Sequence, residues 1–157
     1  MTVDPQEFRR VGGHFATGVT IVTVEHGGAT CGLTVNAFTT VSLEPPIVLV
    51  SIGTASRSLA CLERAARFGL SVLGEEQEAI ARVFAGKDDD KLARVPARRG
   101  ATGVPLIDGA IAWLECETER RIPAGDHVLF LASVQGLGAR AGRPLLFFRG
   151  RYARLSD

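Results

Sequence analysis

Residues 17–57 have the sequence TGVTIVTVEHGGATCGLTVNAFTTVSLEPPIVLVSIGTASR, and this stretch predicts a β-rich fold. Two runs rich in β-branched residues, 19–24 and 31–35, lie on either side of His26-Gly27-Gly28. Glycines between two such runs are typical of a hairpin turn. A third run, 47–52, follows a pair of prolines. The pattern therefore predicts three strands, of which the first two form an antiparallel hairpin.

Small hydroxyl and amide side chains gather between the second and third runs, in the loop Thr34-Val35-Asn36-Ala37-Phe38-Thr39-Thr40. Such side chains cannot repay the cost of their desolvation by core packing, so a loop of this kind between strands suggests a polar, flat ligand. Thr and Asn are also common in ordinary turns, where they bond to their own backbone. The loop alone suggests a binding site and leaves its ligand open.

The rest of the chain adds strands with little helix between them. In 112–119, Leu114 and Cys116 alternate with Glu115, Glu117 and Glu119, which predicts a strand with one wet face. In 128–134 the apolar stripe begins at Val128 and leaves His127 on the opposite face. Further runs occupy 68–73, 145–148 and 151–155. Around seven strands of this kind predict an antiparallel barrel rather than a parallel sheet.

Three helices are expected. Asp4-Pro5 predicts a helix start, and Gly12-Gly13 its end. Residues 77–84 carry apolar residues at helical spacing, and another helix is expected to begin at Arg57. Ser56, Arg57 and Ser58 would then lie at a helix N-terminus, where free N–H groups favour an anion such as phosphate. Ser56 could equally serve as a plain N-cap.

The 157 residues predict a single domain over 1–157. A composition of 46% hydrophobic and 22% charged residues with net charge +1 gives no case for nucleic acid or an anionic membrane as partner. With neither a leader-like N-terminus nor a long apolar run, a soluble, cytoplasmic protein is expected. Cys31, Cys61 and Cys116 are odd in number and widely spaced, so we expect reduced core residues without disulfide or metal roles.

Several polar segments are open to more than one interpretation. Residues 85–105 lack a pattern and are expected to form a functional or a solvated loop, and Asp88-Asp89-Asp90 within them is not expected to bind a metal. The glycines of 136–142 precede a strand rather than a helix, so they predict a hairpin turn and not a dinucleotide site. His127, in Gly125-Asp126-His127, stands alone and is either a solvated residue or a functional one. With so few catalytic side chains, an enzyme of this sequence would rely on a bound cofactor.

Taken together, six motifs resemble a known family in order and spacing, over nearly the whole chain. They are Phe15-Ala-Thr-Gly-Val-Thr-Ile-Val-Thr23, Gly32-Leu-Thr-Val-Asn-Ala-Phe38, Val41-Ser-Leu-Glu-Pro-Pro46, Phe84-Ala-Gly86, Gly125-Asp-His127 and Arg149-Gly-Arg-Tyr152. The chain is similar in these motifs to the flavin reductase domain of short-chain, two-component monooxygenase reductases. It departs from the family pattern at Leu92, Arg94, Ala132 and Phe148.

The resemblance implies a mainly β fold, a Greek-key split β-barrel that binds FMN, or sometimes FAD, and usually forms a homodimer. Around the flavin ring and ribityl chain it implies contacts from Thr34, Val35, Asn36, Ala37, Ser51 and Ile52. At the phosphate it implies Ser56, Arg57 and Ser58. On the far side of the flavin it implies Phe84, Gly86 and Lys91. His127 would contact the nicotinamide of NADH or NADPH, and no metal is implied.

The first hypothesis is therefore an NAD(P)H-dependent flavin reductase that passes reduced flavin to a separate monooxygenase. An FMN-binding electron carrier without reductase activity shares every flavin contact and remains an alternative. An oxidase of the pyridoxamine-phosphate type would need a second basic pocket, for which the cluster at Arg94, Arg98 and Arg99 is available.

Overall fold

The predicted hairpin forms the centre of the fold. In the computed structural model, which describes residues 2–157, β2 (Thr20–His26) pairs antiparallel with β3 (Ala29–Val35). Gly27 and Gly28 join them with φ values of +60° and +81°, which a two-residue turn of this kind requires and which L side chains rarely adopt. The hairpin expected from the sequence is therefore confirmed.

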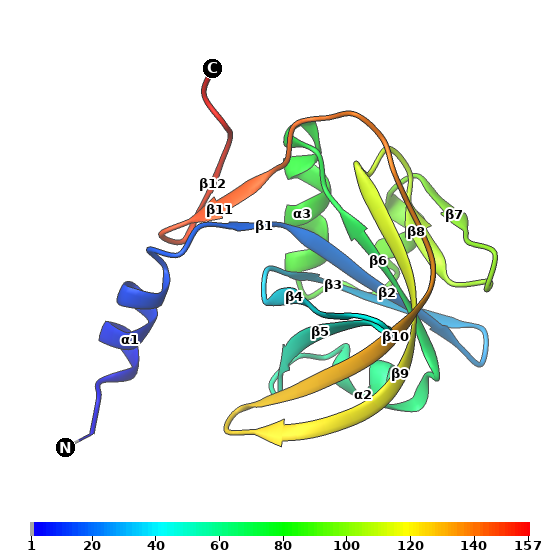
Figure 1. The fold of residues 1–157 in the computed structure, drawn as a ribbon, viewed down its shortest axis with the longest axis horizontal. Helices are drawn as coiled ribbons and strands as arrows, with labels where there is room; N and C mark the ends of the chain where they lie inside the picture. The colour runs from blue at the N-terminus through cyan, green and yellow to red at the C-terminus, as the bar shows by residue number, and fades with distance from the viewer. Residues whose placement is uncertain (1) are drawn as a thin grey trace.

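The remaining elements follow in chain order (Figure 1). The helices are α1 (Pro5–Gly12), α2 (Leu59–Arg64) and α3 (Glu78–Ala85), with single 3₁₀ turns at η1 (Glu75–Gln77) and η2 (Lys91–Arg94). The other strands are β1 (Thr17–Gly18), β4 (Phe38–Leu43), β5 (Pro46–Gly53), β6 (Arg67–Val72), β7 (Ala97–Arg99), β8 (Pro105–Ile107), β9 (Ala112–Ala124), β10 (His127–Ala139), β11 (Leu146–Phe148) and β12 (Arg151–Ala153). The prediction of a mainly β, antiparallel protein with few helices is confirmed.

Seven strands form one curled antiparallel sheet in the order β3-β2-β6-β9-β10-β5-β4. Its two edge strands, β3 and β4, are consecutive in the sequence and are joined by Asn36 and Ala37 alone. A two-residue link can span only a short distance, so the sheet has to curl until its edges meet there. The predicted loop 34–40 is thus shorter than expected, because its first two residues end β3 and its last three begin β4.

The core lies inside the curled sheet and beneath α3. In β10 the side chains of Val128, Phe130 and Ala132 are buried, so the predicted alternation is confirmed. A second cluster forms where Phe84 and Ala81 of α3 cover Ile21 of β2. Full burial of one such large side chain contributes about 1.5–3 kcal/mol, so these two clusters supply much of the folding free energy.

Glu115 differs from the prediction, since its side chain is buried rather than wet. The backbone N–H groups of Ala101 and Thr102 donate to its carboxylate over 3.0 and 2.6 Å, and the Thr102 hydroxyl donates as well. Burial tends to raise the pKa of Glu115, but these hydrogen bonds and the charge of Arg98 outweigh it and lower the pKa. The strand alternation could not reveal this, because the donors come from a distant turn.

The structure also differs from the prediction of a hairpin turn at the glycines of 136–142. Gly136 and Gly138 lie within β10, where a Cβ on Gly138 would stand 2.0 Å from the Trp113 ring. The chain leaves the sheet only after Ala139, and β11 pairs with β1 and β12 instead of β10. The predicted hairpin turn is therefore wrong, and close packing against Trp113 accounts for the missing side chain at Gly138.

The N-terminal helix stands apart from the body of the molecule (Figure 1). Asp4 caps α1 by accepting hydrogen bonds from the N–H groups of Gln6 and Glu7, so the predicted helix is confirmed. None of the residues of α1 is buried. Among residues 2–157, no helix combines the length and apolar character needed to cross a membrane.

Candidate functional site

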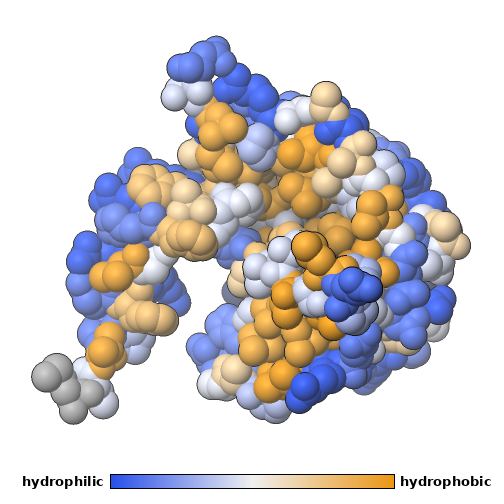
Figure 2. Space-filling view, in the orientation of Figure 1, coloured by the Kyte–Doolittle hydropathy of each residue, from blue (hydrophilic) through white to orange (hydrophobic). Residues whose placement is uncertain are grey.

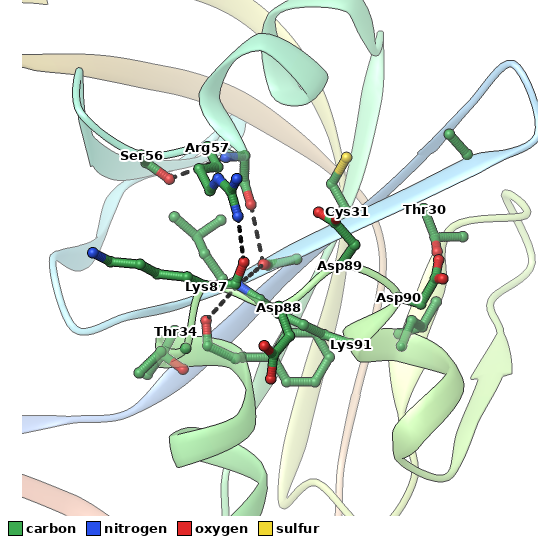
Figure 3. A pocket seen from close by; sticks show the side chains of 18 of the residues that line it. Thr30, Cys31, Thr34, Ser56, Arg57, Lys87, Asp88, Asp89, Asp90 and Lys91 are labelled. Atoms are coloured by element: carbon green, nitrogen blue, oxygen red, sulfur yellow. Dashed lines mark hydrogen bonds between the residues drawn. The ribbon is translucent and has the colours of Figure 1, made fainter.

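A pocket of about 840 Å³ opens between β3, the turn before α2 and the loop after α3. We call it the lysine pocket. Its lining includes Gly32, Thr34, Ser56, Arg57, Ser58, Phe84, Gly86, Lys87, Asp88 and Lys91. Figure 3 places Ser56 and Arg57 on one side of it and Thr34 on another. Its volume is in the range of small-molecule sites, and its walls mix cations, hydroxyls and apolar surface.

Close packing between β3 and α3 forms the base of the lysine pocket. The Thr34 hydroxyl donates to the Ala81 carbonyl over 2.6 Å, which fixes the strand against the helix. A Cβ on Gly32 would lie 2.4 Å from the Phe84 ring, so only glycine lets this ring pack there. The Thr34 side chain is therefore engaged within the protein rather than pointing freely into the pocket.

The turn Gly53–Ser58 forms the upper wall. The Ser58 hydroxyl is buried and donates to the Gly32 carbonyl over 3.1 Å, while Arg57 Nη1 donates to the Lys87 carbonyl over 2.5 Å. Helix α2 begins at Leu59, two residues later than the sequence predicts. Ser56 and Arg57 therefore precede the helix, and they are presented to the pocket by the turn rather than by a helix end.

Lys91 closes the far side. Its ammonium group donates to the carbonyls of Phe84 and Gly32 over 3.1 and 3.4 Å, which leaves one of its three protons for a ligand. Burial lowers the pKa of Lys91, and the charge of Asp88 only partly offsets that effect. Asp88 itself is paired with Arg94 over 2.7 Å.

A second group of residues, which we call the histidine corner, lies at the other end of the same turn. It consists of Asn36, Ala37, Ser51, Asp126 and His127. Strand pairing sets His127 opposite Gly53, and the Ser51 N–H donates to the Ala37 carbonyl over 3.0 Å. The Asp126 carbonyl accepts from the Thr54 N–H over 2.8 Å. One short turn therefore contacts both the lysine pocket and the histidine corner.

Within residues 2–157, the His127 ring is hydrogen-bonded at one nitrogen. Its Nδ1 lies 2.7 Å from Asp126 Oδ1, and a carboxylate can only accept, so Nδ1 carries the proton. The hydrogen bond and charge of His127 lower the pKa of Asp126. The His127 side chain is 46% exposed. Its Nε2 is therefore free toward solvent and toward Gly53, where a Cβ would lie 3.7 Å away.

The predicted site residues divide between the two regions. Those that line the lysine pocket are Thr34, Ser56, Arg57, Ser58, Phe84, Gly86 and Lys91. Val35 and Ile52 are in the hydrophobic core, so only their backbone atoms can reach a ligand. The sequence missed Cys31, Gly32 and Lys87 as pocket residues. Lys87 could have been found from its position between Gly86 and Lys91, whereas Cys31 carries no such signal.

The cysteine prediction is wrong for two of the three residues. Cys31 on β3 and Cys61 on α2 are joined in a disulfide, with their Cα atoms 6.4 Å apart. Cys116 is a buried free thiol, as expected, and burial raises its pKa to about 12. The sequence separation of 30 between Cys31 and Cys61 carries no pairing signal. Only the packing of α2 beside the hairpin brings the two together.

The fold and site together define an antiparallel β protein with a polar, partly cationic pocket beside an exposed histidine. Comparison with known proteins gives the family: residues 12–156 match the flavin reductase like domain. The chain belongs to this family, which confirms the resemblance noted in its motifs.

Individual relatives are consistent with this family. The reductase subunit HsaB of a flavin-dependent monooxygenase from Rhodococcus jostii is 40% identical over 151 residues, covering 96% of this chain and 77% of that protein. An NADH-dependent FMN reductase from Streptomyces nodosus subsp. asukaensis is 41% identical over 160 residues, with 96% and 85% covered. The solved structure of an NADH:FAD oxidoreductase from Streptomyces globisporus, in complex with NAD and FAD fragments, has a TM-score of 0.93 at 40% identity, covering 99% of this chain and 97% of that one.

The donor set of the lysine pocket fits a flavin phosphate. Arg57 and Lys91 bring positive charge to the pocket, and Ser56 adds a hydroxyl, although Asp88, Asp89 and Asp90 also line it. Asp88 is paired with Arg94. Charge-assisted hydrogen bonds from such groups are the usual means of holding a phosphate. Phe84 is buried beneath the pocket, where its ring packs on Gly32 and supports the pocket floor.

Proposed function

We propose that this chain is an NAD(P)H-dependent flavin reductase that supplies reduced flavin to a separate monooxygenase component. The observation that carries the proposal is the turn Gly53–Ser58, which presents Ser56 and Arg57 to the lysine pocket and lies against Asp126 and His127 at its other end. A phosphate-bearing ligand held in the pocket can thus extend toward an exposed imidazole. The family membership and the named activities of the relatives support the same function.

When bound, the flavin supplies the redox chemistry by accepting a hydride from the nicotinamide. The residues of this chain bind and orient the two ligands. Arg57 and Lys91 hold the phosphate by charge, and Asn36, Ala37 and Ser51 border the ring. His127, kept in one tautomer by Asp126, offers Nε2 to the nicotinamide side. No side chain of the chain has to act as acid, base or nucleophile in this arrangement.

Anaerobic mixing tests the proposal. Purified protein is mixed with FMN or FAD and then with NADH or NADPH, and the flavin absorbance is followed in a stopped-flow instrument. Catalytic bleaching with at least one pair is the expected result, and the rates give the preferred flavin and nucleotide. Binding of flavin without bleaching by either nucleotide would instead identify an electron carrier of the same fold.

We also propose a homodimer, because several apolar side chains of residues 8–15, which we call the N-terminal arm, are exposed. Phe8, Val11 and Phe15 are 70%, 55% and 80% exposed, and Leu43 on the edge strand β4 is 91% exposed. Figure 2 shows apolar atoms on both the arm and the body, with an open gap between the two. Exposed apolar surface of this kind favours a protein interface, and a second copy of the chain would cover it.

Sedimentation velocity tests the dimer. Phe8→Asp is expected to shift the protein from dimer to monomer, because it puts a charge into the interface. Gln6→Asp is the matched control, since Gln6 lies on the other face of α1 at 100° per residue. A monomer in the unaltered protein, or equal effects of the two substitutions, would contradict the proposed interface.

A further inference from the structure

The disulfide lies in the wall of the proposed flavin site. Cys31 lines the lysine pocket, and Figure 3 shows it on the same side as Arg57. Cys61 is in the short helix α2, directly after the turn that carries Ser56 and Arg57. Both cysteines are partly exposed. The cystine is therefore accessible to small reagents and joins two walls of one pocket.

Non-covalent contacts also tie this turn to its neighbours, including the hydrogen bonds that Thr54 donates to the Asp126 carbonyl. The Ser58 hydroxyl donates to the Gly32 carbonyl, and Arg57 reaches across to the Lys87 carbonyl. The Arg57 contact is on an exposed loop, where a hydrogen bond competes with water. The Cys31–Cys61 bond is a covalent link between β3 and α2, the helix that directly follows the turn. Breaking it leaves the position of Ser56 and Arg57 dependent on these weaker contacts.

We propose that Cys31 and Cys61 are a redox-active pair whose oxidation state sets how tightly the protein holds flavin. The cystine form pre-organises the turn and binds flavin more tightly, and the dithiol form binds it more loosely and releases it faster. Pre-organisation has this effect because less conformational entropy is lost on binding. The inference rests on the proposed function, since it takes the lysine pocket as the flavin site.

The established chemistry of the family supplies the oxidant. Released reduced flavin reacts with dioxygen to give oxidised flavin and hydrogen peroxide. One peroxide molecule then converts the two thiols to a disulfide: the S–S bond forms, the O–O bond breaks, and the two thiol protons leave in two molecules of water. A small dithiol reverses the reaction by exchange and is itself oxidised.

The consequence is a feedback on flavin release. Reducing thiol pools favour the dithiol form, which releases flavin readily. When no oxygenase consumes the product, peroxide accumulates, the cystine forms, and the protein retains its flavin. Cys116 takes no part, because its thiol is buried in the core.

The experiment compares the two forms of the unaltered protein. Protein is reduced with dithiothreitol or oxidised with hydrogen peroxide, and the reagent is removed. Alkylation followed by intact-mass measurement counts the free thiols. The Kd for FMN comes from fluorescence titration, and the dissociation rate from stopped-flow displacement. Peroxide is expected to remove the Cys31 and Cys61 thiols and to lower the Kd about fivefold, mostly through slower dissociation.

Cysteine variants and measurements of Tm distinguish a redox effect on flavin binding from a purely structural crosslink. Cys31→Ser and Cys61→Ser are expected to abolish the response to peroxide, whereas Cys116→Ser retains it. Equal Kd values for the two forms, even with a higher Tm for the cystine form, would reduce the bond to a structural crosslink and overturn the inference. So would tighter binding by the dithiol form, or thiols that peroxide leaves free. If neither form binds FMN or FAD, the flavin assignment itself fails, and the inference fails with it.

Discussion

The lysine pocket and the histidine corner are contacted by the same turn, yet they are built differently. In the lysine pocket the side chains of Thr34, Ser58 and Lys91 all donate hydrogen bonds to backbone carbonyls of neighbouring elements. In the histidine corner, His127 has one partner and an exposed ring. The first region is pre-organised by the chain itself, while the second is open to a ligand that comes and goes.

This difference indicates that the two regions have different functions. A pre-formed pocket lowers the cost of binding, so changes there should act on flavin affinity and on folding. An exposed imidazole that is oriented by a single carboxylate contributes little to the fold. Changes at the histidine corner should therefore act on the rate of flavin reduction and leave flavin affinity unchanged. The four predictions that follow test this division, from the largest expected effect to the smallest.

His127→Ala should have the largest effect. We expect kcat/KM for NAD(P)H to fall about a hundredfold, because the nicotinamide loses its positioning contact, while the Kd for FMN changes little. Asp126→Asn should give a smaller loss with an altered pH profile, since the ring is no longer held in one tautomer. Steady-state kinetics and flavin titration together measure both effects. An unaltered rate would remove His127 from the mechanism.

Arg57→Ala is expected to raise the Kd for FMN about thirtyfold, which is the range of one charge-assisted hydrogen bond to phosphate. The rate at saturating flavin should stay close to that of the unaltered protein. Arg64→Ala is the matched control, because Arg64 lies in the last turn of α2, the helix that follows Arg57, and outside the pocket lining. Equal losses in the two variants would show a general charge effect instead of a specific contact.

Thr34→Val tests whether this residue supports the pocket or contacts the ligand. The substitution keeps the shape but leaves the Ala81 carbonyl without its donor, which should lower the free energy of unfolding by about 1–2 kcal/mol. Denaturant unfolding measures the loss, and Thr39→Val serves as an exposed control. A large rise in the Kd for FMN with unchanged stability would assign Thr34 to the ligand instead.

The smallest effect concerns the pH dependence of flavin affinity. Lys91 is a cation below its pKa and neutral above it, and burial lowers that pKa. Its attraction for phosphate is therefore lost at a lower pH than for an exposed lysine. Between about pH 7 and pH 10 the Kd for FMN should rise about threefold, in a range where the phosphate itself no longer titrates. Lys91→Met should bind more weakly and without this pH dependence.

Patterns of local origin predicted much of the fold. The Gly27-Gly28 hairpin, the helix capped by Asp4 and the buried stripe that begins at Val128 all follow from turn chemistry, capping and alternation. Errors arose where distant segments decide the outcome. The turn at Ala101 and Thr102 binds the Glu115 carboxylate, and Trp113 covers Gly138. The Ser58 hydroxyl bonds to the distant Gly32 carbonyl, and α2 starts only at Leu59.

By itself, the sequence determined the antiparallel class, the family and a set of polar residues near the hairpin, because strand periodicity and ordered motifs are properties of neighbouring residues. The tertiary structure alone decided that these polar residues fall into two regions joined by the turn Gly53–Ser58. It also decided that Cys31 meets Cys61. The physical reason is that long-range packing sets both: closure of the sheet through the two-residue link between β3 and β4 brings distant strands together, and α2 packs beside the hairpin.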